Sequence, residues 1–309
     1  MGKNDGGIFI METILQEVAV IVLNYVSYSM TIECVDRIKA SKCHIVIVDN
    51  CSPNNSFELL FNYYKEVANV SVIKSDRNGG YAYGNNVGIR WAEKNITKIK
   101  YISIMNPDVI LDEKTLASLV TFLNEHEKVA VVAPLVIESN KKTIDSMGWK
   151  LWNKKELLQS AGYFFAKRIQ KKSEGELVVE DGHIVHYVDV VKGCFFVTKL
   201  KTIMQMGLLD EETFMYGEED IFAYKVKKSN LKEAVLIDQY CKHDHIKVSD
   251  KAQLLRIQKH VGKTYESRRI LLKKYYRANR LELLWYDFAV AINVHVMIPI
   301  AYYIKRGLK

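Results

Sequence analysis

The chain has 309 residues, of which 49% are hydrophobic and 26% are charged, a composition that excludes a disordered protein. Its net charge of +8 favours an anionic partner such as a phosphorylated substrate or a membrane surface, although a solvated lysine-rich surface would give the same balance. The five cysteines form no C-x-x-C pair, so we expect neither a disulfide framework nor a zinc knuckle, and a reduced, cytosolic setting fits best.

Apolar runs alternate with helical patterns along the first 110 residues. Four continuous apolar runs predict buried strands at 18–23, 44–48, 70–74 and 101–105. Helical patterns lie at 29–39 and 57–67, and a third helix follows the glycine-rich run RNGGYAYGNNVG and ends near residue 94. This alternation predicts a parallel sheet with helices on both faces.

The pattern is less regular after residue 110. The predicted elements are a helix at 114–127, strands at 129–133 and 189–198, a helix at 221–228 and a strand at 234–237. From residue 251 the chain alternates basic, tyrosine and apolar residues, which predicts a helical extension. The fold class is therefore α/β: a Rossmann-like, mostly parallel sheet flanked by helices, with a C-terminal helical, partly apolar extension.

Polar residues gather where the predicted strands end. Asn24, Asp49, Asn78 and Asp108 each lie at or just beyond the end of a strand. Because ligands of such sheets bind at the carboxyl ends of the strands, these four side chains predict one edge of a binding site.

Asp108 follows a buried strand in the sequence YISIMNPD. A carboxylate at the tip of a buried strand is costly unless something pairs with it. Together with His243 or His245, Asp108 would suit a divalent cation, which would neutralise a diphosphate. The alternative is that Asp108 caps the helix that follows, because Asp is a favoured N-cap residue.

Three consecutive acids, Glu218, Glu219 and Asp220, open a predicted helix. A carboxylate at this position would be able to take a proton from a hydroxyl nucleophile. The alternative is that acids in the first turn only interact favourably with the helix dipole.

Seven stretches in order resemble the family 2 glycosyltransferases, and most closely the rhamnosyltransferase-like branch of bacterial surface polysaccharide synthesis. They are VAVIVLNY, IVIVDNCSPNNS, SDRNGGYAYGNNVGI, YISIMNPDVIL, VKGCFFVTK, GLLDEETFMYGEED and HDHIKVS. The resemblance implies a GT-A domain at 17–250 and an extension at 251–309. It also implies a metal-dependent, inverting transfer from a nucleotide-sugar donor, dTDP-rhamnose or a UDP-hexose, to a hydroxyl of a saccharide acceptor, which we expect to be linked to lipid.

The resemblance also assigns roles to individual residues. Those expected at the donor are Asn24, Asp49, Asn78, Gly80, Asn86, Gly88 and Asn106. Asp108 stands in a D-x-D-like motif and would hold Mg²⁺ or Mn²⁺, with His243 or His245 as a later metal or phosphate contact. If the acids are aligned with those of the family, the base is Asp220, which we slightly favour. If Lys225 is aligned with the family's arginine, the base is Glu219.

The apolar segment 288–304 is shorter than the roughly 20 residues that span a membrane, and basic residues flank it on both sides. We therefore expect it to lie in the interface of an anionic leaflet, which would place the protein in the cytoplasm, peripheral to the inner face of the cell membrane. The alternative is a helix packed on the core or on a second subunit, as in a homodimer. Residues 1–17 lack the long apolar core of a signal peptide, so export is not expected.

A second function stays open from the sequence. The irregular base motif would also suit a non-catalytic GT-A-like protein that binds sugar nucleotide or partners another transferase. Nucleic-acid binding is not expected, because the lysines do not gather around exposed aromatic residues in a recognised module.

Overall fold

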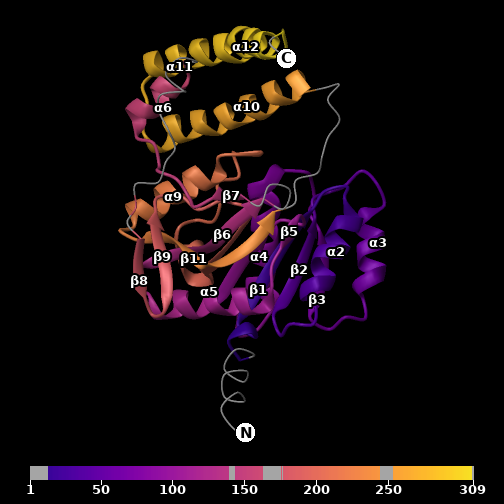
Figure 1. Cartoon of the computed structure of the whole chain (residues 1–309). Coiled ribbons are helices and arrows are strands. Elements are labelled where there is room, and N and C mark those ends of the chain that lie inside the picture. The colour runs from indigo at the N-terminus through magenta and orange to yellow at the C-terminus, as the bar shows by residue number, and fades with distance from the viewer. Residues whose placement is uncertain (1–12, 139–142, 163–174, 176, 244–252, 308–309) are drawn as a thin grey trace.

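The computed structural model describes residues 13–138, 143–162, 175, 177–243 and 253–307. One large mixed sheet, in the order β3-β2-β1-β4-β10-β6-β11-β9-β8, forms the centre of the molecule (Figure 1). The strands are β1 (Val18–Asn24), β2 (His44–Asp49), β3 (Val70–Lys74), β4 (Tyr101–Met105), β5 (Val109–Ile110), β6 (Val129–Glu138), β7 (Thr143–Ser146), β8 (Leu177–Glu180), β9 (His183–Val188), β10 (Phe195–Lys199) and β11 (Lys232–His243). The helices of the sheet region are α2 (Tyr28–Ile38), α3 (Ser56–Tyr64), α4 (Gly80–Asn95), α5 (Glu113–Glu125), α6 (Lys154–Ser160), α8 (Leu200–Gln205) and α9 (Glu218–Lys228).

The first four predicted strands are confirmed as one parallel unit. β3, β2, β1 and β4 pair in parallel, so the ends of these strands meet at one edge of the sheet. β10 then runs antiparallel to β4, which makes the sheet mostly parallel on one side and mixed on the other.

Helices cover both faces of the sheet because the side chains of β1 point alternately to either side. Val18, Val20 and Val22 pack in one core with α2, α3 and α5. Ala19 and Ile21 pack in a second core with α4, α8 and α9.

The glycine-rich run is helical, whereas the sequence analysis placed it before the helix. α4 begins at Gly80 and includes Gly84 and Gly88. A Cβ on Gly84 would lie 2.4 Å from Leu23, and one on Gly88 would lie 2.5 Å from Ile21. These two glycines therefore let the helix backbone approach the sheet closely.

Several predicted boundaries in the second half are wrong, and the strand predicted at 129–133 runs on to Glu138. The strand predicted at 189–198 begins only at Phe195, and Asp189 instead accepts hydrogen bonds from Leu151 and Lys227. Helix α9 begins at Glu218, so the three acids open it as expected, whereas the strand predicted at 234–237 runs from Lys232 through His243.

The C-terminal helices lie together at one end of the molecule, above the sheet in the view shown (Figure 1). They are α10 (Gln253–Ile270), α11 (Arg280–Ile292) and α12 (Ile298–Gly307), with π-helical turns at Leu271–Tyr275 and Asn293–Met297. Their buried side chains, among them Tyr265, Leu272 and Tyr286, share a core with α6 and α9. The predicted boundary at residue 250 lies outside the described residues.

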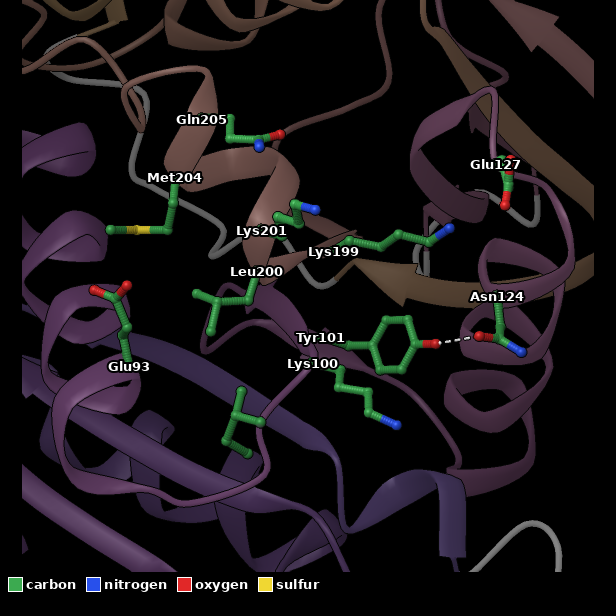
Figure 2. Close-up of a pocket in the computed structure, with 11 residues that line it drawn as sticks. Glu93, Lys100, Tyr101, Asn124, Glu127, Lys199, Leu200, Lys201, Met204 and Gln205 are labelled. Carbon is green, nitrogen blue, oxygen red and sulfur yellow. Dashed lines mark hydrogen bonds between the residues drawn. The ribbon is translucent and has the colours of Figure 1, made fainter.

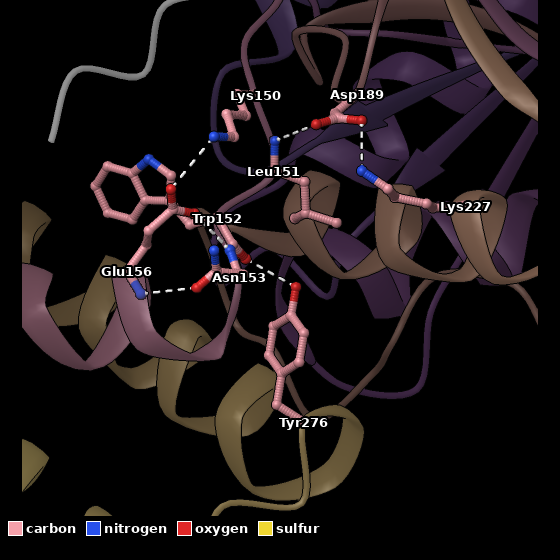
Figure 3. Close-up of polar contacts among 8 residues, drawn as sticks. All are labelled: Lys150, Leu151, Trp152, Asn153, Glu156, Asp189, Lys227 and Tyr276. Carbon is pink, nitrogen blue, oxygen red and sulfur yellow. Dashed lines mark hydrogen bonds and ion pairs between the residues drawn. The ribbon is translucent and has the colours of Figure 1, made fainter.

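Polar contacts tie the segment before α6 to the turn that precedes α11 and, through Asp189, to α9 (Figure 3). The hydroxyl of Tyr276 donates to the carbonyl oxygen of Trp152 at 2.7 Å. Asp189 accepts from the backbone N–H of Leu151 at 3.1 Å and from Nζ of Lys227 at 3.0 Å. The segment before α6 is thus held from both sides.

The last helix is longer than the apolar segment that the sequence predicted. Arg280–Ile304 forms 25 continuous helical residues. Among the described residues, it is the helix that is long and apolar enough to cross a membrane, judged by length and composition. One face of it is occupied, however, because Tyr286 and Val294 are buried against the rest of the protein.

Candidate active site

The ends of β1 and β2 are joined by a buried polar network. Asn24 donates its side-chain N–H to Oδ2 of Asp49 at 2.8 Å, and the hydroxyl of Thr31 donates to Asn24. The backbone N–H and the hydroxyl of Ser52 also donate to Asp49, at 2.9 and 2.7 Å. These hydrogen bonds compensate the burial of the Asp49 carboxylate, which is fully enclosed. The network fixes the turn after β2, and the contact of Asp49 with a nucleobase stays a prediction.

A second network joins this turn to the start of α4. Asn50 donates to the side-chain oxygen of Asn78 and to the carbonyl oxygen of Gly80, each at 3.1 Å. Gly80 has φ +88°, and a Cβ there would lie 2.2 Å from the carbonyl oxygen of Phe214. The backbone N–H of Tyr81 donates to that same oxygen at 2.7 Å. Gly80 is therefore required where α4 meets the loop before α9.

Asn86 faces a different region from Asn78. Its side chain donates to the carbonyl oxygen of Leu209 and to Glu211, and its oxygen accepts from the N–H of Leu209. Asn86 is fully buried and clamps α4 to the segment that follows α8. Its donor contact stays a prediction, as does that of Asn106, whose backbone N–H donates to the carbonyl oxygen of Cys194 at 2.9 Å.

Asp108 and His243 are brought together by strand pairing. Asp108 directly precedes β5, in which Val109 lies opposite His243 at the end of β11. Oδ2 of Asp108 lies 3.2 Å from Nε2 of His243. Oδ1 of Asp108 is buried and has no hydrogen-bond partner among the described residues. His245 lies outside the described residues.

Asp108 does not cap the helix that follows it. Asp112 is the N-cap residue of α5, and its side chain accepts from the backbone N–H of Thr115 at 2.7 Å. The alternative role that the sequence left open for Asp108 is therefore wrong.

The Asp108–His243 pair suits a hard divalent cation that a substrate diphosphate also binds. Mg²⁺ is commonly held by one or two carboxylates together with phosphates and waters. Within the described part of the chain there is no group of three or more His, Cys, Asp or Glu side chains that would hold a metal by itself. The buried Oδ1 of Asp108, which has no partner among the residues that the structure describes, fits a site that the substrate completes.

The three acids at the start of α9 have different surroundings. Gly217, with φ +89°, turns the chain into the helix, and its N–H donates to Oε2 of Glu219 at 3.0 Å. The carboxyl carbon of Glu219 lies 3.8 Å from where a Cβ of Gly193 would be. Asp220 is buried and accepts from the indole N–H of Trp149 at 2.8 Å.

Like Asp220, Glu218 is buried. Its exposed fraction is 7%, and its Oε2 has no hydrogen-bond partner among the described residues. Burial raises the pKa of Glu218 well above its ordinary value, and the negative charges of Glu219 and Asp220 raise that pKa further. Glu218 therefore keeps its proton to a higher pH than an ordinary glutamate, and a carboxyl that holds its proton cannot take one from an acceptor hydroxyl.

Tyr81 and Glu233 complete this region, and the sequence analysis missed both. The hydroxyl of Tyr81 donates to the carbonyl oxygen of Gly193 at 2.6 Å. Burial, and then the negative charges of Glu218, Glu219 and Asp108, raise the pKa of Tyr81, so this hydroxyl lies within electrostatic reach of both acidic groups. Tyr81 lies within the glycine-rich run, which was a usable signal, whereas Glu233 lies in an ordinary strand pattern.

A hollow of about 680 Å³ lies at the opposite edge of the sheet (Figure 2). It is lined by Tyr101 at the start of β4 and by Lys199 at the end of β10, and Tyr101 donates to Asn124 at 2.7 Å. Because it lies where the parallel strands begin, it is separate from the polar edge described above.

Known proteins resemble this chain in sequence. The family model for glycosyl transferase family 2 matches residues 18–184, which is more than half of the chain. The low-salt glycan biosynthesis hexosyltransferase Agl10 of Haloferax volcanii is 25% identical over 224 residues. This match covers 72% of the chain and 65% of Agl10, slightly less than two thirds of that relative.

Solved structures share the fold at low sequence identity. GalNAc-T7 with UDP, GalNAc and Mn²⁺ is 13% identical with a TM-score of 0.56, covering 90% of this chain and 58% of that chain. Residues 1–349 of TarS from S. aureus are 16% identical with a TM-score of 0.55, covering 90% of this chain and 71% of that chain. The predicted GT-A fold is confirmed.

Proposed function

The chain belongs to glycosyl transferase family 2, and from this premise we propose that it is an inverting glycosyltransferase. It moves a hexose from a nucleoside-diphosphate donor, a UDP-hexose or dTDP-rhamnose, to a hydroxyl of a saccharide acceptor in the synthesis of a bacterial cell-surface polysaccharide. The hexosyltransferase name of the Haloferax relative supports a hexose donor, and the rhamnosyltransferase-like branch remains a prediction.

The observation that carries this proposal is the Asp108–His243 pair at the end of the parallel strands. Asp108, with His243 beside it, would hold Mg²⁺ or Mn²⁺ together with the donor diphosphate. When bound, the metal offsets the charge that develops on the departing diphosphate. The Mn²⁺ and UDP in the GalNAc-T7 structure support this role, as does the unpartnered oxygen of Asp108.

Glu219 is the base that we propose, with Asp220 as the second candidate. The carboxylate of Glu219 lies beside Gly193, near the hydroxyl of Tyr81. Asp220 is enclosed and accepts the indole N–H of Trp149. Glu219 takes the proton of the acceptor hydroxyl while that oxygen bonds to C1 of the donor sugar. The bond from C1 to the diphosphate oxygen breaks at the opposite side, and the configuration inverts.

We also propose that the C-terminal helix rests on an anionic membrane surface, where a lipid-linked acceptor would be held. Large apolar side chains on α11 and α12 are exposed, and Tyr286 occupies the opposite, protein-facing side. Basic residues adjoin both ends of this helix in the sequence. An apolar face with flanking basic residues is typical of helices that lie in the membrane interface.

The proposal is tested by calorimetry with dTDP-rhamnose, UDP-glucose, UDP-galactose, UDP-GlcNAc and GDP-mannose, each with Mn²⁺ and with EDTA. We expect one donor to bind in a metal-dependent manner, and Asp108→Ala to lose this dependence. Equal affinity with Mn²⁺ and EDTA would remove the metal role. Donor binding without turnover on any acceptor would favour the non-catalytic alternative, and no binding to the folded protein would contradict the donor site.

A further inference from the structure

A groove of about 570 Å³ lies between the loop Phe214–Tyr216 and helix α10, and we call it the acceptor groove. On the loop side it is lined by Phe214, Met215 and Tyr216. On the helix side the lining residues, which recur at helical spacing, are Gln253, Arg256, Ile257, Lys259, His260 and Lys263. No Asp or Glu side chain of the described residues lines it.

The groove combines exposed aromatic rings with uncompensated positive charge. Phe214 and Tyr216 are 41% and 38% exposed, and the ring of Tyr216 lies 4.2 Å from that of His260, centroid to centroid. Arg256 and Lys259 are exposed and have no carboxylate partner in the part of the chain that the structure describes. Lys263 differs from them, because its Nζ lies 2.7 Å from Glu266.

The loop that forms one wall of the groove also touches the candidate active site. The carbonyl oxygen of Phe214 accepts the N–H of Tyr81, and Tyr216 directly precedes the turn at Gly217 that starts α9. Burial, and then the charge of Glu218, raise the pKa of Tyr216. A ligand in the groove would therefore extend toward Glu219.

We propose that the acceptor groove binds a saccharide that carries a phosphate ester, with its sugar against Tyr216 and Phe214 and its phosphate at Arg256 and Lys259. Aromatic faces suit the apolar faces of sugar rings, and arginine and lysine are the side chains that bind phosphate. This inference rests on the proposed function, because it names the class of acceptor that the same site would use. The phosphate belongs either to a lipid-linked saccharide or to a phosphodiester in a polymer.

The test uses glucose 1-phosphate as probe, measured by calorimetry with the donor site saturated by UDP and Mn²⁺, and methyl glucoside as its neutral counterpart. The variant is Arg256→Gln with Lys259→Gln. Its matched control is Lys199→Gln with Lys201→Gln, which removes the same charge at the opposite edge of the sheet. We expect the groove variant to weaken glucose 1-phosphate binding about tenfold or more, the control to retain it, and methyl glucoside to bind more weakly than the phosphate.

Several outcomes would overturn the inference. They are equal affinity of the groove variant and the wild-type protein, binding of methyl glucoside as tight as that of glucose 1-phosphate, and no binding of glucose 1-phosphate at all. If the groove variant instead loses binding to phosphatidylglycerol vesicles and keeps glucose 1-phosphate, the groove contacts lipid headgroups and not the acceptor.

Donor binding, measured separately with UDP, distinguishes this inference from the proposed function. If UDP binds and the groove variant binds glucose 1-phosphate as the wild-type protein does, the inference about the groove is wrong and the proposed function stands. Loss of the UDP site in the wild-type protein contradicts the proposed function, while phosphate binding that depends on Arg256 would still support the groove. Binding is then compared for two phosphate-bearing acceptors, one soluble and one with a lipid chain. The tighter of the two shows whether the phosphate belongs to a polymer or to a lipid.

Discussion

At the scale of single residues, the three acids of α9 illustrate how one helical turn separates chemical roles. Consecutive residues of a helix point about 100° apart, so Glu218, Glu219 and Asp220 face different surroundings. Glu218 is enclosed, Asp220 accepts the indole N–H of Trp149, and Glu219 lies beside Gly193. Only the orientation of the helix distinguishes them.

The base assignment predicts unequal effects of two matched substitutions. Glu219→Gln should lower kcat by about 10²–10⁴-fold, which is the usual contribution of a general base. Asp220→Asn should lower it less than about tenfold, because the amide oxygen still accepts the N–H of Trp149. Steady-state kinetics with the donor found by calorimetry measures both. A larger loss in Asp220→Asn would exchange the two roles.

Burial of Glu218 predicts a pH-dependent stability. Its pKa is raised in the folded protein, so the folded state holds more protons than the unfolded state above the ordinary pKa of 4.5. The free energy of unfolding therefore falls as pH rises from 4.5 toward the folded pKa. Glu218→Gln removes this penalty, so its Tm should exceed that of the wild-type protein by more at pH 8 than at pH 5.

The control for this prediction is Glu93→Gln, an exposed acid on α4. The Tm difference between this variant and the wild-type protein should be nearly the same at both pH values. If the Glu218→Gln difference is also independent of pH, Glu218 ionises in the folded protein as it does in the unfolded chain.

At the scale of elements, two helical glycines, Gly88 of α4 and Gly262 of α10, predict opposite effects of replacement by alanine. A Cβ on Gly88 would lie 2.5 Å from Ile21 and 2.8 Å from Val48, whereas a Cβ on Gly262 in α10 would meet nothing within 4 Å. Gly88→Ala should therefore destabilise the protein by about 1–3 kcal/mol through overpacking. Gly262→Ala should stabilise it by up to about 1 kcal/mol, because alanine favours the helix. Urea unfolding measures the free energy of unfolding of both variants. If Gly88→Ala leaves it unchanged, the sheet shifts to accommodate the added methyl group.

The sequence could predict those elements whose patterns are local. Continuous apolar runs predicted the parallel strands, because strands covered on both faces carry apolar side chains at successive positions. The helical nature of the glycine run was missed, although Gly80, Gly84 and Gly88 recur every four residues and so lie on one helical face. Low helix propensity of glycine outweighed this spacing in the interpretation.

The site could be predicted only in part, because its members are far apart in the sequence. The strand-tip position of Asp108 predicted a metal pair with His243 or His245, and the register of β5 against β11 brings His243 to Asp108. Tyr81 and Glu233 approach the acids of α9 only through tertiary packing. Local patterns carry no information on such contacts.

At the scale of the whole molecule, the C-terminal helices present an apolar stripe to solvent. Its members are Leu281, Leu284, Trp285, Phe288, Ile292, Val296, Ile300, Tyr303 and Ile304, which recur at helical spacing and are 39–78% exposed. The other side of the helix carries the buried Tyr286 and Val294. A helix that spans a bilayer alone would be apolar on all sides and exposed to lipid all round. A helix in the membrane interface has one apolar side toward the lipid and the other side toward the protein, as here.

The stripe predicts membrane binding that two substitutions should remove. Deletion of residues 285–309 is a poor test, because it also removes Tyr286 and Val294 from the core they share with α10. Leu284→Glu with Phe288→Glu changes only exposed side chains, and it should lower binding to phosphatidylglycerol vesicles about a hundredfold or more, because each apolar group contributes about 1.5–3 kcal/mol. Vesicle co-sedimentation measures this, and UDP binding reports that the donor site is intact.

The matched control is Leu177→Glu with Val179→Glu, which changes two exposed apolar side chains on β8. This variant should bind vesicles as the wild-type protein does, because β8 lies at the edge of the sheet and away from α11. If the stripe variant still sediments with vesicles, another surface binds the membrane. If the wild-type protein does not bind vesicles but is a dimer by analytical ultracentrifugation, and the stripe variant is a monomer, the stripe is a subunit interface. In that case the apolar side chains are covered by a second copy of the chain, and the acceptor reaches the site without a membrane contact through α11.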